Sequence, residues 1–178
     1  MRIEATITGL TAEQLFRLYS DLEIRPKMEH PPKVLKLVEQ PTKYSDVVYS
    51  EIHLPFPMTN REFLHKRFYL GNKEYPEVVK ELGLYDWDHK YYVIIAESIE
   101  RPDYPITSKL VRAESKFSYT LIEEDPNDSE VVRMKSISCT KMNGNIPSSM
   151  LASMGMKMAG KMLDSLKESS KKIFGEGK

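Results

Sequence analysis

The chain turns at Asn143-Gly144-Asn145-Ile146-Pro147 and then enters a long helical pattern. Apolar residues recur at positions 150, 151, 154, 158, 159, 162, 163 and 166, the spacing that places them on one face of an α-helix. Four of them are methionines: Met150, Met154, Met158 and Met162. Methionine is unbranched and polarisable, so such a face can repack around apolar shapes of different kinds. The pattern predicts either a lid over an apolar cavity or an ordinary core helix in which methionine fills gaps.

The residues before this helix predict one short helix and a series of strands. A strand over 2–8 comes first, and a helix over about 12–20 follows it, with Thr11 as its N-cap. Six further segments have the composition of strands, namely 33–40, 45–54, 61–70, 91–99, 111–123 and 130–140. Short links between successive strands favour an antiparallel meander over βαβ units. One face of that sheet must be covered, and the terminal helix over about 147–172 is the large element available to cover it.

Composition and charge narrow the function classes. Lys plus Arg equals Asp plus Glu, at 26 each, so the electrostatic case for nucleic acid is weak. The length of 178 residues predicts a single domain over 1–178, with a tail over 173–178. Cys139 is the only cysteine, which excludes an internal disulfide and fits a reducing compartment. With no apolar leader and no run of 18 apolar residues, we expect a cytoplasmic protein, at most peripheral to membranes.

Four stretches form an ordered set along the chain. They are Asn60-Arg61-Glu62-Phe63, Ala96-Glu97-Ser98-Ile99 before a loop with prolines, Val111-Arg112-Ala113-Glu114, and Gly144-Asn145-Ile146-Pro147. In order and spacing, from about residue 2 to 172, they resemble the START family of steroidogenic acute regulatory protein-related lipid transfer domains. The resemblance implies an α+β helix-grip fold, in which a curved antiparallel sheet wraps around the long C-terminal helix and leaves a lipid-sized tunnel. It also implies that the chain binds one lipid and transfers it between membranes or senses it.

The resemblance further implies a binding site and a gate. Several family members hold an acidic and a basic residue as a pair inside the tunnel, at about the places of Glu51 and Arg67. A charge in an apolar cavity is costly unless it is paired, although the periodicity leaves open that both residues face solvent. The expected lining residues are Tyr92, Ile94, Ala113 and Phe117 of the strands and Met150, Leu151, Met154, Met158 and Met162 of the helix. The loop over 101–108, with Arg101, Pro102, Tyr104 and Pro105, is expected to close on the helix as a gate.

Three departures from the family pattern leave questions open. The chain begins after the helix that usually precedes the family's first strand. Cys139-Thr140 stands near a place where the family often has Asp. The segment over 72–89 is longer than the usual hairpin, and could touch a membrane or a partner through Tyr85 and Trp87.

Two other readings of surface and aromatic residues stay open. Lysines on the polar side of the last helix could meet anionic lipid head groups or simply be solvated; they are Lys157, Lys161, Lys167, Lys171 and Lys172. Tyrosines could build a cage for an ammonium group or be ordinary strand residues; they are Tyr49, Tyr69, Tyr91, Tyr92 and Tyr104.

The rival functions are a small-molecule enzyme of the helix-grip superfamily, cyclase-like or hydrolase-like, and a protein-interaction module of the same fold. The chain has no Gly-x-Ser-x-Gly, His-Glu-x-x-His or phosphate-loop motif, so it is not predicted to be an enzyme and no cofactor is expected. His53, His65 and Glu51 form a weak metal candidate, and no metal is predicted. The expected partners are one lipid of the sterol, phospholipid or ceramide class and, transiently, a membrane surface. The lipid itself, and whether the chain is part of a larger protein, stay open.

Overall fold

The computed structural model describes residues 1–56, 58–84, 87–107 and 109–175, apart from the side chains of residues 148–149, 151–154, 156 and 158–159. Its elements follow in chain order: β1 (Arg2–Thr8), α1 (Ala12–Ser20), the 3-10 helix η1 (Arg25–Lys27), β2 (Val34–Thr42), β3 (Ser45–Ile52), β4 (Arg61–Gly71), α2 (Pro76–Glu81), β5 (Tyr91–Ser98), β6 (Val111–Arg112), β7 (Glu114–Asp125), β8 (Asp128–Lys141) and α3 (Ser148–Phe174).

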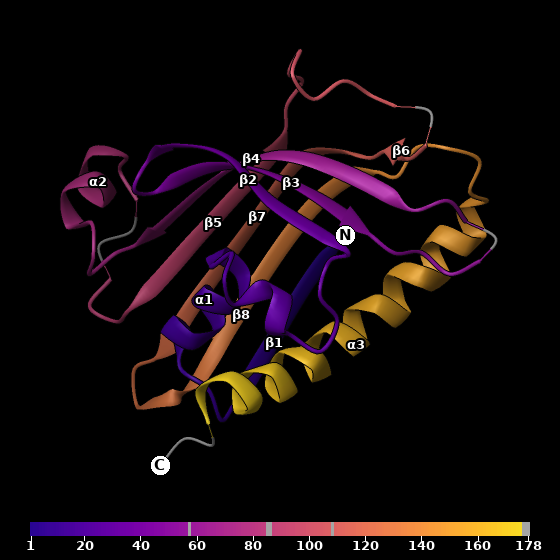
Figure 1. Cartoon of the computed structure of the whole chain (residues 1–178). Helices are drawn as coiled ribbons and strands as arrows, with labels where there is room; N and C mark the ends of the chain where they lie inside the picture. The colour runs from indigo at the N-terminus through magenta and orange to yellow at the C-terminus, as the bar shows by residue number, and fades with distance from the viewer. Residues whose placement is uncertain (57, 85–86, 108, 176–178) are drawn as a thin grey trace.

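The strands form one curved sheet in the order β1-β8-β7-β5-β4-β3-β2, with every pair along this path antiparallel. The short strand β6 lies off the path and pairs in parallel with β4. Figure 1 shows α1 and the long helix α3 on the same side of this sheet. The arrangement is an α+β helix-grip fold, as the sequence predicts.

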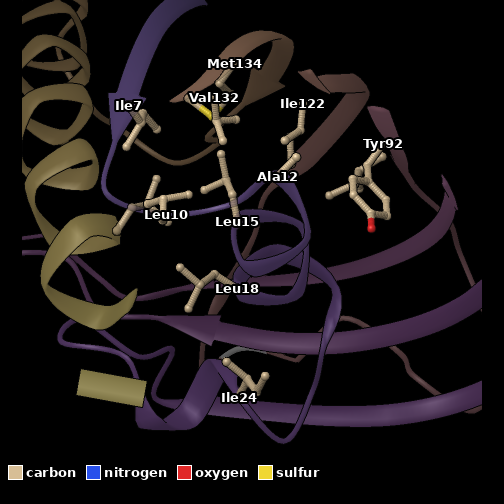
Figure 2. Close-up of a cluster of buried hydrophobic side chains, with 12 residues drawn as sticks. Ile7, Leu10, Ala12, Leu15, Leu18, Ile24, Tyr92, Ile122, Val132 and Met134 are labelled. Atoms are coloured by element: carbon tan, nitrogen blue, oxygen red, sulfur yellow. The ribbon is translucent and has the colours of Figure 1, made fainter. Parts of the chain in front are cut away.

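The hydrophobic core lies between the sheet and α1, on what we call the inner face. Thr11 and Gln14 form a capping box that starts α1 and satisfies backbone N–H groups at its first turn. Figure 2 shows the buried Leu15 and Leu18 of α1 within a cluster to which β1, β5, β7 and β8 also contribute. Each fully buried leucine contributes about 1.5–3 kcal/mol, so this cluster fixes α1 to the sheet.

The opposite, outer face is covered in part by the segment between β4 and β5. Val79 of α2 packs on Tyr91, Val93 and Leu121 of the sheet. Trp87 stacks on His89, with ring centroids 5.0 Å apart, and lies half-buried against the same cluster. Trp87 therefore covers the sheet and is not a free membrane anchor, whereas Tyr85 lies outside the described residues.

The C-terminal part of α3 anchors the helix to the rest of the molecule. Leu166 is buried in the core beneath it, and the Ser169 hydroxyl accepts a hydrogen bond from the Glu29 backbone N–H. Ile173 and Phe174 also pack against the core, so the expected tail over 173–178 is wrong for these two residues. The five lysines of the polar face are exposed, and Lys172 pairs with Glu29 at 2.9 Å.

One predicted strand is divided. The segment over 111–123 is split at Ala113 into β6 and β7. The Ala113 backbone N–H bonds to the Glu62 carbonyl on β4, whereas β7 pairs with β5 and β8. A β-bulge between Ser115 and Phe117 then shifts the alternation of side chains along β7.

Candidate functional site

The register of β3 against β4 decides which face carries each charged residue. Glu51 lies opposite Glu62, and Asp46 lies opposite Arg67. Successive side chains on a strand point to opposite faces, and Glu62 is five residues from Arg67. Glu51 and Arg67 are therefore on opposite faces of the sheet, and the predicted pair between them is wrong.

Arg67 pairs instead with Asp46 on the inner face. Its Nε donates to Oδ1 at 2.7 Å and its Nη2 to Oδ2 at 2.5 Å, and the two residues are only 5% and 3% exposed. Arg67 also donates to the carbonyls of Tyr19 and Ser20, at 3.2 and 3.0 Å. These carbonyls belong to the end of α1, where helix C=O groups lack partners and a cation is favourable. The acidic partner that sequence reasoning missed is thus Asp46.

A second guanidinium lies beside this pair. Arg25 of η1 donates through Nη1 to the Tyr19 carbonyl at 3.1 Å, which is the same oxygen that Arg67 contacts. Its Nε is buried and has no hydrogen-bond partner. Burial, together with the positive charge of Arg67, lowers the pKa of Arg25 to about 10.

His65 lies two residues before Arg67 and so shares the inner face. Its Nε2 is also buried without a hydrogen-bond partner. Burial lowers the pKa of His65 to about 4, and the charges of Arg67 and Arg25 act in the same direction. His65 is therefore neutral at pH 7, with one ring nitrogen available for a hydrogen bond.

Hydroxyl groups extend this polar surface across the sheet. Ser98 of β5 lies opposite His65 of β4 on the inner face. Across the next strands, Ala96 lies opposite Arg67, Ser118 opposite Ala96, and Ser138 opposite Ser118, so all of them share this face. The hydroxyls of Thr120 and Ser136 are 2.9 Å apart. We call the whole set the polar belt; it consists of Arg25, Asp46, His65, Arg67, Ser98, Ser115, Ser118, Thr120, Ser136, Ser138 and Thr140. The alternation of hydroxyl residues at 136, 138 and 140 was the sequence signal for it.

The expected lining residues have different surroundings. Tyr92 and Ile94 lie on the inner face but are packed in the core; the Tyr92 ring stacks on Phe16 of α1 at 4.3 Å. Ala113 is fully buried at the junction of β6 and β7. Phe117 is 43% exposed and points to the outer face, since it precedes the inward Ser118. Phe117 therefore does not line the inner face as expected, because the bulge after Ser115 shifts the alternation of side chains along β7.

The methionine face of α3 is described only at its two ends. Met150 is exposed, and Met162 is half-buried against the core with its Sδ 3.6 Å from the Tyr19 hydroxyl. The predicted lining side chains of Leu151, Met154 and Met158 lie outside the described residues.

The expected gate loop contacts the far side of the sheet. Arg101 is bonded to Glu39 of β2 and to Asp103, and the Tyr104 ring lies 5.7 Å from the ring of Tyr49 on β3. The Tyr104 carbonyl accepts a hydrogen bond from Arg112, and Pro102 and Pro105 are exposed. These contacts of the described loop residues run to β2, β3 and β6.

Beneath this loop, the outer face holds a satisfied polar cluster. Arg112 pairs with Glu62 at 2.9 Å, and the Tyr49 hydroxyl contacts Glu62 and Glu51 at 2.8 and 3.0 Å. A hollow of about 320 Å³ adjoins these residues. Arg112 therefore holds the outer cluster and the loop together.

The weaker sequence hypotheses are not supported by the geometry. The candidate tyrosines are divided between the faces, with Tyr69 and Tyr92 inward and Tyr49 and Tyr91 outward, so they do not form one cage. Glu51 and His65 are likewise on opposite faces. No group of three or more His, Cys, Asp or Glu suited to a metal ion occurs among the described residues.

A buried arginine ties together the loops at the end where α3 begins. Arg61 donates through Nε to the Met142 carbonyl at 2.8 Å, through Nη2 to the Asn143 carbonyl at 2.9 Å, and also to the Thr59 carbonyl. A cavity of about 560 Å³ adjoins the same turn, lined by Lys116, residues 139–144 and Ile146. Phe56, in the loop that Arg61 holds, is 96% exposed.

The chain is similar in sequence to a known domain family and to two characterised proteins. Residues 17–172 match the model of the START domain. The chain is 26% identical to the mouse phosphatidylcholine transfer protein over 124 residues, which cover 70% of this chain and 51% of that protein. It is 25% identical over 122 residues to the human mitochondrial StAR-related lipid transfer protein 7, covering 68% of this chain and 29% of that protein. The chain thus spans about half the length, or less, of these curated relatives.

Solved structures show the same fold. Human STARD10 superposes with a TM-score of 0.79 at 20% identity, covering 97% of this chain and 63% of that one. The Zhui aromatase/cyclase from Streptomyces sp. R1128 superposes with a TM-score of 0.58 at 13% identity, covering 97% and 95%. Within the described part of the chain, no helix is both long and apolar enough to cross a bilayer.

Proposed function

Because the chain belongs to the START domain family, we propose that it binds one lipid molecule between the inner face of its sheet and α3, and transfers that lipid between membranes or senses it. The observation that supports this most is the polar belt. It has partly accessible hydroxyls and the partnerless His65 Nε2 on the inner face of the sheet, and the partnerless Arg25 Nε on η1 beside them. A lipid head group needs such fixed polar partners inside an otherwise apolar site.

The apolar part of the site has to offset the cost of removing acyl chains from the membrane. At about 25 cal/mol per Å², a few hundred Å² of exposed lipid surface costs on the order of 10 kcal/mol. Inner-face neighbours of the belt supply apolar walls, such as Val48 opposite His65 and Phe63 beside it. The methionine pattern of α3 supports a roof that adapts to lipids of different shape.

The lipid class we favour is a phospholipid. Two of the relatives above are named for the transfer of phosphatidylcholine or of lipids. A guest with a charged head group suits the charged part of the belt better than a sterol or a ceramide does.

Exchange is proposed at the end where α3 begins. The loop with Phe56, the turn over 142–147 and the loop over 101–108 would separate there, with Arg61 linking the first two. An aromatic side chain exposed to water at a loop tip is suited to enter a membrane interface. The exposed lysines of α3, including Lys157 and Lys161, would add attraction to anionic lipids at about 1 kcal/mol each.

The test is transfer of labelled phosphatidylcholine from donor to acceptor vesicles. The chain is expected to raise the transfer rate in proportion to its concentration, and Phe56→Ser to lower that rate severalfold while phospholipid binding persists. Leu82→Ser is the matched control, because Leu82 is an exposed apolar residue at the C-cap of α2. Absence of both binding and transfer would overturn the proposal, and chemical turnover of a bound small molecule would favour a cyclase-like enzyme instead.

A further inference from the structure

The charges of the polar belt do not balance. Arg67 uses both carboxylate oxygens of Asp46. Arg25 has no ion pair within the described chain, and its Nη1 shares the Tyr19 carbonyl with Arg67. Two guanidiniums and one carboxylate leave one positive charge, on the half-buried Arg25, without a counter-charge among the described residues. Burial of an unpaired charge is strongly unfavourable, so such a group normally has an anionic partner.

We propose that Arg25 and His65 form a subsite for the phosphate group of the bound lipid. Both residues have a buried nitrogen without a hydrogen-bond partner, Nε of Arg25 and Nε2 of His65. Both also lie near Arg67, because Arg25 shares the Tyr19 carbonyl with it and His65 shares its face of β4. The inference rests on the proposed lipid-binding function and specifies the chemistry of its guest.

The donor set matches a phosphodiester. Guanidinium is the side chain best suited to planar, charge-assisted contacts with phosphate oxygens. The neutral imidazole of His65 can donate one further hydrogen bond from Nε2–H, in the tautomer that protonates this atom. The hydroxyl of Ser98, on the strand position opposite His65, lies next along the belt and could contact the ester oxygens of a glycerolipid.

This assignment separates lipid classes. Sterols, ceramide and diacylglycerol have hydroxyl head groups and no negative charge, so they would leave Arg25 without a counter-ion. Phosphatidylcholine and diacylglycerol with the same acyl chains differ only in the phosphocholine group. Their relative loading therefore isolates the contribution of the subsite from that of the apolar walls.

The experiment loads the full chain from vesicles that contain equal amounts of the two lipids, and measures the bound ratio by mass spectrometry after extraction. We expect the wild type to prefer phosphatidylcholine, and Arg25→Gln to lower that preference about tenfold, as for loss of a hydrogen bond to a charged group. His65→Leu replaces the imidazole by an apolar side chain of similar size, and it should lower the preference for phosphatidylcholine severalfold. Arg133→Gln is the control, because Arg133 is an exposed arginine on β8.

The outcomes separate the subsite from the function. An unchanged preference in both Arg25→Gln and His65→Leu would overturn the subsite while lipid binding stands. Since Arg25 also holds the end of α1, a folding defect in Arg25→Gln leaves His65→Leu to decide. If neither the wild type nor any variant binds phosphatidylcholine or diacylglycerol, the proposed function itself fails. If inorganic phosphate alone stabilises the wild type against heat, and Arg25→Gln abolishes this, the subsite holds a free phosphate and the lipid assignment is overturned.

Discussion

Strand β4 takes part in two ion pairs on opposite faces of the sheet, with Asp46 of β3 on the inner face and Arg112 of β6 on the outer face. The two pairs differ in how completely the polar groups around them are hydrogen-bonded. On the outer face, Glu62 is bonded to Arg112 and Tyr49, and Arg112 also to the Tyr104 carbonyl. On the inner face, the Arg67–Asp46 pair stands beside two buried nitrogens that have no partner. Completed networks stabilise a fold, whereas buried polar groups without partners mark a place where something else binds. We therefore propose a structural role for the outer pair and a role in ligand recognition for the groups around the inner one.

The largest effect is expected from Asp46→Ala. The substitution leaves the buried Arg67 and the half-buried Arg25 with no carboxylate partner among the described residues. Breaking a buried pair in this way costs about 3–5 kcal/mol. Urea denaturation measures the loss of unfolding free energy. The control Glu51→Gln removes a half-buried carboxylate of the outer face and should change stability by less than about 1 kcal/mol. Equal losses in the two variants would contradict the distinction between the faces.

The next effect depends on pH. The pKa of His65 is about 4 in the folded chain and about 6.5 in the unfolded one, so the unfolded state binds more protons between these values. Stability should therefore fall as the pH drops from about 6.5 to 4, by up to about 3 kcal/mol from this group. His65→Leu should remove that part of the pH dependence, whereas the exposed His30→Leu should keep it. Parallel curves for wild type and His65→Leu, obtained by denaturation at several pH values, would show that His65 is not held neutral by burial.

A smaller effect is expected from Glu62→Gln on the outer face. The amide keeps the shape and part of the hydrogen bonding to Tyr49, and it relieves the repulsion from Glu51, so the loss should be about 1–3 kcal/mol. The preference between phosphatidylcholine and diacylglycerol should stay at the wild-type value. A changed preference would mean that the outer cluster also takes part in ligand recognition.

The smallest effect is expected from Phe117→Ser. Its side chain is exposed on the outer face, and such surface substitutions usually change stability by no more than about 0.5 kcal/mol. The neighbouring Ser118→Val replaces an inward hydroxyl of the belt and should alter the bound lipid ratio with little loss of stability. If Phe117→Ser changes lipid loading and Ser118→Val does not, the assignment of faces along β7 is wrong.

Much of the fold was readable from the sequence because its signals are local. The long helix follows from the periodicity after residue 147, and the antiparallel meander follows from strands separated by short links. The position of α1 was also predictable, since Thr11 caps a segment with a buried leucine face. The split at Ala113 was not, because a parallel pairing with β4 depends on where the distant loop over 53–60 places that strand.

The site was less readable because it depends on register. Glu51 and Asp46 are both acidic residues of β3, and only the pairing with β4 decides which one meets Arg67. A bulge of one residue was enough to turn Phe117 outward. Arg25 lies in an irregular segment with no periodicity, so nothing local in the sequence connects it with His65. The hydroxyls at 136, 138 and 140 could have been recognised by their alternation.

Native mass spectrometry of the chain after purification from cells tests the central claim most directly. We predict one added mass per chain that corresponds to a single phosphate-containing lipid and that is lost when the protein is denatured. A chain that carries no lipid, both as purified and after incubation with phospholipid vesicles, would contradict the account.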